Sequence, residues 1–161
     1  MVNIDGKEYI VDGGYAAPFL KPLPRNLSND YTITIGKENY IIKPIDKNGK
    51  TKVEQHYDGK LQHWYTAKPK SRRIEEFRKV IEDSYADDAT FMNAIRITRF
   101  SDNGALVLNN LELTEIKNSE SFSVKAAIND IPALVEEKFG MPKKLVKEAI
   151  QSIKQLKDIY D

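Results

Sequence analysis

Four Asp-Gly or Asn-Gly pairs constrain the fold of this chain more than any other feature of its sequence. They are Asp5-Gly6, Asn48-Gly49, Asp58-Gly59 and Asn103-Gly104, and each lies between segments rich in β-branched and aromatic residues. Both residues of such a pair adopt the positive φ that a two-residue hairpin turn requires. Consecutive hairpins of this kind predict an antiparallel sheet and favour one that curls towards a barrel.

The segments on either side of these turns predict the β-strands. Each segment is short, rich in β-branched and aromatic residues, and bounded by turn-forming residues. The expected strands are Glu8–Val11, Tyr31–Ile35, Asn39–Ile45, Thr51–Tyr57, Leu61–Thr66, Asn93–Phe100, Ala105–Ile116 and Phe122–Ala126.

The first expected helix covers residues 71–84 and separates two groups of strands. Ser71 can cap it, and apolar residues recur along it at helical spacing. This apolar stripe consists of Ile74, Phe77, Val80 and Ile81. Pro69 and the basic residues around it mark a boundary near residues 67–71 between a β-rich body and a helix–hairpin–helix unit. The sequence therefore predicts an α+β fold.

Two more helices are expected at the C-terminal end. The first begins at Asn129 or Asp130, carries Pro132 in its first turn and ends before Gly140, which suits the preferences of helix ends. Pro142 opens the last helix. One face of that helix is predicted to carry Leu145, Ala149, Ile153, Leu156 and Tyr160.

The composition argues against several classes of function. Lys and Arg number 25 against 24 Asp and Glu, a net charge of +1, whereas binding to nucleic acid or an anionic membrane usually needs a basic excess. The sequence has no cysteine, which excludes disulfides, thiolate metal sites and a Cys nucleophile on this chain. It shows no secretion signal and no apolar run of the ~20 residues that span a bilayer. We therefore expect a cytoplasmic protein.

Several stretches resemble one enzyme family. The stretch "YIVDGGY" at residues 9–15 resembles the Tyr-Leu-Val-Asp-Val-Gly-Phe-Gly motif of the arylamine N-acetyltransferases. Four further stretches resemble the family in the same order: "PFLKPLP", "WYTAKPKSRRIEEF", "ATFMNAIRITRFSDNGALVLNNLEL" and "IPALVEEKFGMP". The resemblance spans roughly Gly6 to Pro142. It implies an enzyme of three parts: a helical N-terminal domain with a Cys, a β-barrel with a His and an Asp, and an α/β lid.

The resemblance also implies a chemistry and a set of site residues. The family's Cys takes an acetyl group from acetyl-CoA and passes it to an arylamine or hydrazine. Asp12 matches the third member of the Cys-His-Asp triad, which orients the imidazolium. Gly14 and Tyr15 are expected on the substrate side of the motif, where glycine lets a ligand approach the backbone. No covalently bound cofactor is implied, and acetyl-CoA is the co-substrate.

This chain resembles only the C-terminal half of such an enzyme. Residues 1–68 correspond to a partial, partly open antiparallel β-barrel, and residues 69–161 to the α/β lid of hairpin strands and helices. The sequence lacks the Cys, and its two histidines lie on segments that do not match the family's His. It departs from the family pattern also at Gly13, Tyr15 and Ala16, and at Asp87 and Ala89 in the loop before the lid strands. We expect it to be inactive alone.

Two other candidate sites follow from the residues themselves. Arg72 and Arg73 are expected in a first helical turn, where cations are unfavourable beside the helix dipole unless an anion binds there. They are candidates for contact with the CoA phosphates, or ordinary solvated residues. An Asp58-Gly59 turn would pair His56 with Leu61 and Glu54 with His63. Diagonal neighbours ~7–8 Å apart disfavour a shared metal site, so solvated histidines are expected, with Val53 and Trp64 in the core.

The function remains open among three readings at this point. The chain is the second half of an acetyltransferase, a non-catalytic module that binds CoA or a protein, or a truncated remnant. The first reading implies a partner, namely a separate N-terminal half carrying the Cys and the His. Without one, the exposed edge of the barrel predicts self-association as a homodimer. For Asp12 alone, a carboxylate that caps a turn is the alternative to a catalytic role.

Overall fold

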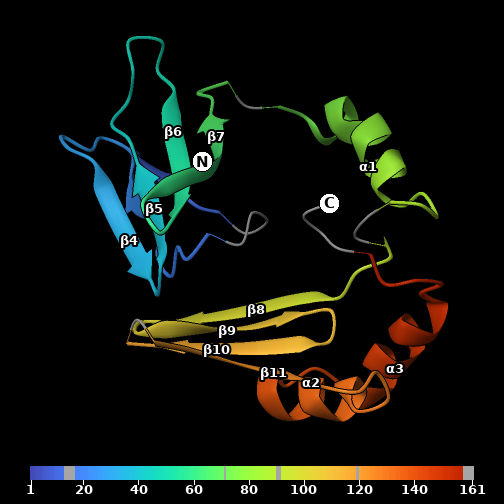
Figure 1. Ribbon diagram of the computed structural model, residues 1–161. Helices are drawn as coiled ribbons and strands as arrows, with labels where there is room; N and C mark the ends of the chain where they lie inside the picture. The colour runs from blue at the N-terminus through green and yellow to red at the C-terminus, as the bar shows by residue number, and fades with distance from the viewer. Residues whose placement is uncertain (13–16, 71, 90–91, 119, 158–161) are drawn as a thin grey trace. The chain divides into compact units, whose positions relative to one another are not determined.

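The computed structural model describes residues 1–12, 17–70, 72–89, 92–118 and 120–157 (Figure 1). Its contacts divide the chain into two compact units. The first consists of Met1–Ser71, Phe100–Gly104 and Ile116–Glu120, and the second of Arg72–Arg99, Ala105–Glu115 and Ser121–Asp161. Each unit has an apolar core of its own, so each is described separately.

The first unit contains two antiparallel sheets. One has the order β1-β2-β3, formed by Val2–Ile4, Lys7–Ile10 and Leu23–Pro24. The other has the order β4-β5-β6-β7, formed by Tyr31–Ile35, Glu38–Ile42, Thr51–Tyr57 and Lys60–Ala67. The buried side chains of Ile10, Leu23, Ile42 and Val53 form the core that joins these sheets.

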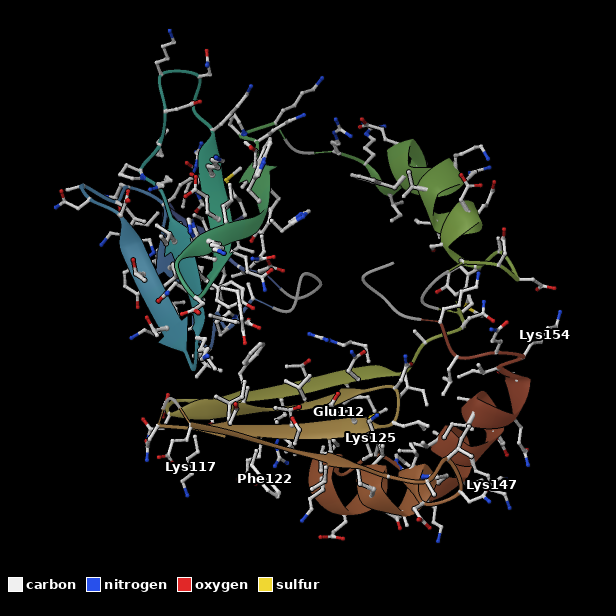
Figure 2. The ribbon with its side chains drawn as sticks, viewed as in Figure 1. Glu112, Lys117, Phe122, Lys125, Lys147 and Lys154 are labelled. Carbon is white, nitrogen blue, oxygen red and sulfur yellow. The ribbon has the colours of Figure 1, made fainter. Side chains whose placement is uncertain are left out.

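The second unit contains most of a sheet of order β11-β10-β9-β8, and the strand ends within residues 100–104 and 116–120 are grouped with the first unit. Its strands are Arg96–Ser101 (β8), Gly104–Asn109 (β9), Glu112–Lys117 (β10) and Glu120–Lys125 (β11). The helices α2 (Ile131–Phe139) and α3 (Lys143–Ser152) pack on one face of it. Their shared core consists of Ile95, Leu108, Leu113, Ile131, Val135 and Val146. The described residues of β11 are exposed, and its Phe122 is 70% exposed (Figure 2).

The expected α+β class is confirmed. The described residues form three antiparallel sheets, the 3₁₀ turn η1 (Ile74–Phe77) and three α-helices, of which α1 is Arg78–Ser84. The strands of the first unit form two separate sheets, and the described residues do not show a closed barrel. None of the described helices has the length and the apolar character needed to span a bilayer.

Two Asp-Gly pairs form the turns that the sequence predicts. Asp5 and Gly6 have φ of 50° and 76° between β1 and β2, and Asp58 and Gly59 have 48° and 76° between β6 and β7. Both pairs therefore adopt positive φ at both central positions, as a type I′ turn requires. The strand β1, which pairs with β2 across the first turn, was not among the expected strands, and neither was the two-residue β3.

The expected strand Ala105–Ile116 is wrong, because it is two strands with a turn between them. Asn110 has a φ of 51°, which ends β9. Its side-chain oxygen accepts a hydrogen bond from the Ile95 amide at 2.9 Å, and its amide group donates to the Lys157 carbonyl at 2.8 Å. These bonds fix Asn110 in a left-handed conformation, which asparagine tolerates better than most residues.

The predicted turn at Asn103-Gly104 is shifted by one residue. The turn residues are Asp102 and Asn103, and neither has positive φ, whereas Gly104 is the first residue of β9. Gly104 is glycine for another reason. A Cβ at this position would lie 1.9 Å from the carbonyl oxygen of Ile116, so the two backbones approach too closely for any side chain.

The C-terminal helices largely follow the prediction. Asp130 occupies the N-cap position of α2 without a capping hydrogen bond from its side chain, proline occupies the first turn, and Gly140 ends the helix in the left-handed conformation at φ 72°. Helix α3, however, ends at Ser152, because Ile153 is extended. Leu145 is 62% exposed and the neighbouring Val146 is buried in its place. Beyond the helix, Ile153 and Leu156 still pack on the core, and Tyr160 lies outside the described residues.

We predict that Gly104→Ala destabilises the protein by about 1–3 kcal/mol, the usual cost of forcing extra atoms into a packed site. The reason is the backbone carbonyl in the path of the new Cβ. Chemical denaturation followed by circular dichroism measures this loss. The neighbouring Asn103→Ala is the control, with an expected change below about 0.5 kcal/mol. Equal stability of the two variants would contradict the close approach of the strands.

Candidate active site

The sequence-predicted Asp12 lies at the end of β2 and accepts a hydrogen bond from a tyrosine far along the chain. The donor is the hydroxyl of Tyr65 on β7, 53 residues away. The core places both partners: Ile10, two residues before Asp12, is buried in it, and Tyr65 packs against it. The bond therefore joins the two sheets of the first unit at the position of the carboxylate.

The local environment keeps the Tyr65 hydroxyl protonated. Burial raises the pKa of Tyr65 well above its ordinary value of 10.0, and the hydrogen bond to Asp12 and its negative charge raise it further. The phenol is therefore a hydrogen-bond donor at any physiological pH. A neutral donor of this kind holds the Asp12 carboxylate in one place.

A buried arginine supports the strand that leads to Asp12. Arg25 is 7% exposed and pairs with the Glu8 carboxylate on β2 and with the Gly49 carbonyl oxygen. The Arg25 amide also donates to the Glu8 carbonyl at 3.0 Å. A buried guanidinium needs such partners to offset its desolvation. Arg25, which directly follows β3, thus holds β2 and the 46–50 turn together.

Tyr65 is a residue that the sequence analysis did not assign. Val53 lies directly opposite Tyr65 in the register of β6 and β7, and directly opposite residues share a face of the sheet. The register expected from the sequence places Trp64 opposite Val53 instead, so it did not identify Tyr65 as a core-facing side chain. Gly14 and Tyr15, the expected substrate-side residues, lie outside the described residues.

The expected anion site at Arg72 and Arg73 assumed that both residues lie in the first helical turn, and the structure places them before it. Both residues are exposed and precede the first turn, which begins at Ile74 and carries Glu75 and Glu76. The Arg73 amide donates to the Glu76 carboxylate at 3.0 Å, and the Arg72 guanidinium lies 5.6 Å from the centre of the Phe77 ring. Arg73 at the N-cap position and Arg72 before it still lie at the positive end of the helix, where Glu75 and Glu76 offset their charge. Contact with CoA phosphates remains a prediction.

The predicted register of His63 is wrong because of a β-bulge. His56 pairs with Leu61 as expected, but Gln55 then pairs with His63 and Glu54 with Trp64. The extra residue on β7 moves the β7 side chains that follow it to the face opposite the one expected. Trp64 is accordingly 53% exposed instead of buried, whereas Val53 is 2% exposed as expected.

Glu54 lies at the centre of a cluster of charged groups on this face of the sheet. Its carboxylate lies 2.7 Å from Lys52, 3.2 Å from His56 and 3.8 Å from Lys43. The hydrogen bond from Lys52 lowers the pKa of Glu54 most, while partial burial opposes that shift. Lys52 also lies 4.9 Å from the centre of the Trp64 ring. The described residues contain no group of three His, Asp or Glu placed to hold a metal ion.

The sequence and the fold of this chain both resemble those of known proteins. Residues 1–147 match the sequence profile of a family described as N-acetyltransferase. The chain belongs to the arylamine N-acetyltransferase family. Its fold resembles that of the arylamine N-acetyltransferase from Mycobacterium abscessus with a TM-score of 0.66 and 14% identity, over 92% of this chain and 57% of that one. A search of curated protein sequences finds no match.

Two further solved family members bear on the site. The enzyme from Mycobacterium marinum, solved in complex with CoA, gives a TM-score of 0.63 at 14% identity over 90% of this chain and 55% of that one. An enzyme from Bacillus cereus, described as having a Cys-His-Glu catalytic triad, gives 0.61 at 16% identity over 87% of this chain and 55% of that one. This chain thus spans little more than half the length of these relatives.

We predict that Tyr65→Phe lowers the free energy of unfolding by about 1.5–3 kcal/mol at neutral pH, because a half-buried carboxylate loses a charged hydrogen bond. The difference between the wild type and the variant should shrink at alkaline pH. A raised pKa in the folded state gives stability below pH 10.0, the ordinary pKa of the phenol, and that stability is lost as the pH rises above this value.

Urea denaturation of both proteins between pH 7 and pH 11 measures this effect. Tyr57→Phe is the matched control, because Tyr57 is 48% exposed, and this change should stay within about 0.5 kcal/mol. A Tyr65→Phe variant as stable as the wild type at every pH would show that the bond to Asp12 contributes nothing.

Proposed function

We propose that this chain is the C-terminal half of an acetyl-CoA-dependent arylamine N-acetyltransferase and supplies Asp12 to its catalytic triad. The observation that carries the proposal is the bond between Asp12 and Tyr65. In a chain of this family, the carboxylate that matches the triad motif is fixed at a strand end by a donor that stays protonated. The partial barrel corresponds to residues 1–68 and the lid to residues 69–161.

The proposed chemistry divides the roles between two polypeptide segments. A thiolate supplied from outside this sequence attacks the thioester carbonyl of acetyl-CoA, and the CoA thiolate leaves and takes a proton. The amine of the acceptor then attacks the acetyl-cysteine, and its proton passes through the imidazole as the cysteine leaves. Asp12 orients that imidazole and stabilises its protonated form, the role of the carboxylate in such triads.

Two features of the sequence support a divided enzyme over a self-sufficient one. It contains no cysteine, so the family's nucleophile must come from another segment. Of its two histidines, His56 lies on β6 with a side chain that is 21% exposed, and His63 lies in the exposed part of β7. Neither lies on the strand β2 that leads to Asp12. The chain alone is therefore proposed to be inactive.

The same proposal names the partner of the chain. It is a polypeptide segment that carries the Cys and the His, either separate or joined to this sequence in a longer protein. Where that segment is absent, we propose that a free sheet edge of the first unit pairs with a second copy. The edges are β1 and β3 of one sheet and β4 and β7 of the other, and such edges readily add a strand.

We predict that the chain releases CoA from acetyl-CoA only when the missing segment is supplied. The segment of the Mycobacterium marinum enzyme without a counterpart in this chain is mixed with it, in the presence of an arylamine acceptor. Asp12→Asn should lower the rate of the mixture by about 10³–10⁴-fold, the usual loss when a triad carboxylate becomes an amide. Free CoA is measured with a thiol reagent after subtraction of the enzyme thiol.

Asp58→Asn is the matched control, because it makes the same chemical change in a turn that accepts asparagine. Activity of the chain alone would refute the divided triad, and full activity of Asp12→Asn in the mixture would refute the role of Asp12. If neither the chain nor the mixture is active, a thermal-shift titration with acetyl-CoA distinguishes a non-catalytic binding module from a truncated remnant. A rise in melting temperature means a binding module, and none means a remnant.

A further inference from the structure

The helical segment 74–84 of the second unit carries an apolar stripe that this unit leaves exposed. The segment consists of η1 and α1, and none of its residues is buried. The exposed apolar side chains along it are Ile74 at 68%, Phe77 at 36%, Val80 at 66%, Ile81 at 39% and, just after the helix, Tyr85 at 69%. Among the described elements, the main contacts of α1 are with η1 alone.

The spacing of these residues matches a helix that is built to be packed. The positions i, i+3, i+6 and i+7 place the four residues within 74–81 on one side of the helix. The opposite side is charged and includes Lys79 and Asp83, which pair at 2.7 Å. Scattered exposed apolar residues need no explanation, whereas a contiguous stripe with a charged opposite side marks an interface.

The length of the segment leads to the same conclusion. Isolated helices shorter than ~12–15 residues are only marginally stable in water, and packing of an apolar face supplies most of the stability of short helices in proteins. Helix α1 has 7 residues and follows 4 residues of η1. A helix this short therefore requires a packing partner for its apolar stripe.

We propose that the apolar stripe of residues 74–85 is the docking surface for the segment that completes the acetyltransferase fold. This inference rests on the proposed function, because the occupant is the same segment that carries the Cys and the His. The relatives give the reason for this choice. The chain covers 57% of the Mycobacterium abscessus enzyme and 55% of the Mycobacterium marinum enzyme, so more than two fifths of each has no counterpart here.

The absence of cysteine allows a clean test of this surface. Val80→Cys and Glu82→Cys each introduce one thiol into a chain that has none. Both positions are exposed, Val80 in the stripe and Glu82 on the charged side. The full chain carrying either change is fused behind the Mycobacterium marinum segment that lacks a counterpart. Fusion makes docking intramolecular, so weak affinity does not hide it.

The measurement is the alkylation rate of each introduced thiol, resolved by peptide mass spectrometry so that the thiol of the added segment is read separately. In the chain alone, both thiols should react at similar rates. In the fusion, Cys at position 80 should react at least about tenfold more slowly, because burial lets it react only when the interface opens. Cys at position 82 should keep its rate.

Every outcome decides the proposal. Equal rates at both positions in the fusion would overturn it. Protection of position 80 in the chain alone would also overturn it. Protection that is independent of protein concentration would mean that the chain itself covers the stripe. Protection that depends on concentration would mean that a second copy covers it. CoA release by the same fusion is measured in parallel. An active fusion with an unprotected position 80 refutes only the docking surface, and a protected but inactive fusion refutes only the proposed function.

Discussion

The first unit depends on one hydrogen bond between residues that are far apart in sequence. Tyr65 lies on β7 of one sheet and Asp12 follows β2 of the other, and the bond between them lies beside the core that both sheets share. Contacts across such a separation close a long loop at a considerable entropic cost. The core of Ile10, Leu23, Ile42 and Val53 offsets that cost, and the hydrogen bond then fixes the carboxylate at one point in the unit.

This arrangement is compatible with a triad. A carboxylate has two oxygens and about four lone-pair positions, so a bond from Tyr65 does not prevent a second donor from binding Asp12. A tyrosine whose pKa is raised by burial donates its proton without transferring it. The phenol therefore orients the carboxylate and leaves its negative charge in place, which is what an imidazolium beside it requires.

Much of the fold was predictable from sequence because local turn chemistry determined it. Asp5-Gly6 and Asp58-Gly59 form their turns as expected, since few other dipeptides adopt positive φ twice. Gly140 and the proline of α2 mark that helix at both ends for similar local reasons. Where the turn depends on distant partners, prediction fails. Asn110 ends β9 in a left-handed conformation that asparagine tolerates and that its bonds to Ile95 and Lys157 hold, and the partners in those bonds are not visible in the local pattern.

The candidate site shows the same division between local and distant causes. Asp12 was predicted because its motif is local, whereas Tyr65 was missed because its role appears only when β7 is aligned with β6 and the core is known. The bulge at Gln55 illustrates how sensitive that alignment is: one extra residue placed Trp64 in solvent and left Val53 in the core. The stripe on η1 and α1 is the converse case. The sequence predicted its apolar face correctly, and that face is exposed within the second unit. A local pattern thus identifies a surface suited to packing, while the segment that packs on it is a matter of the whole fold.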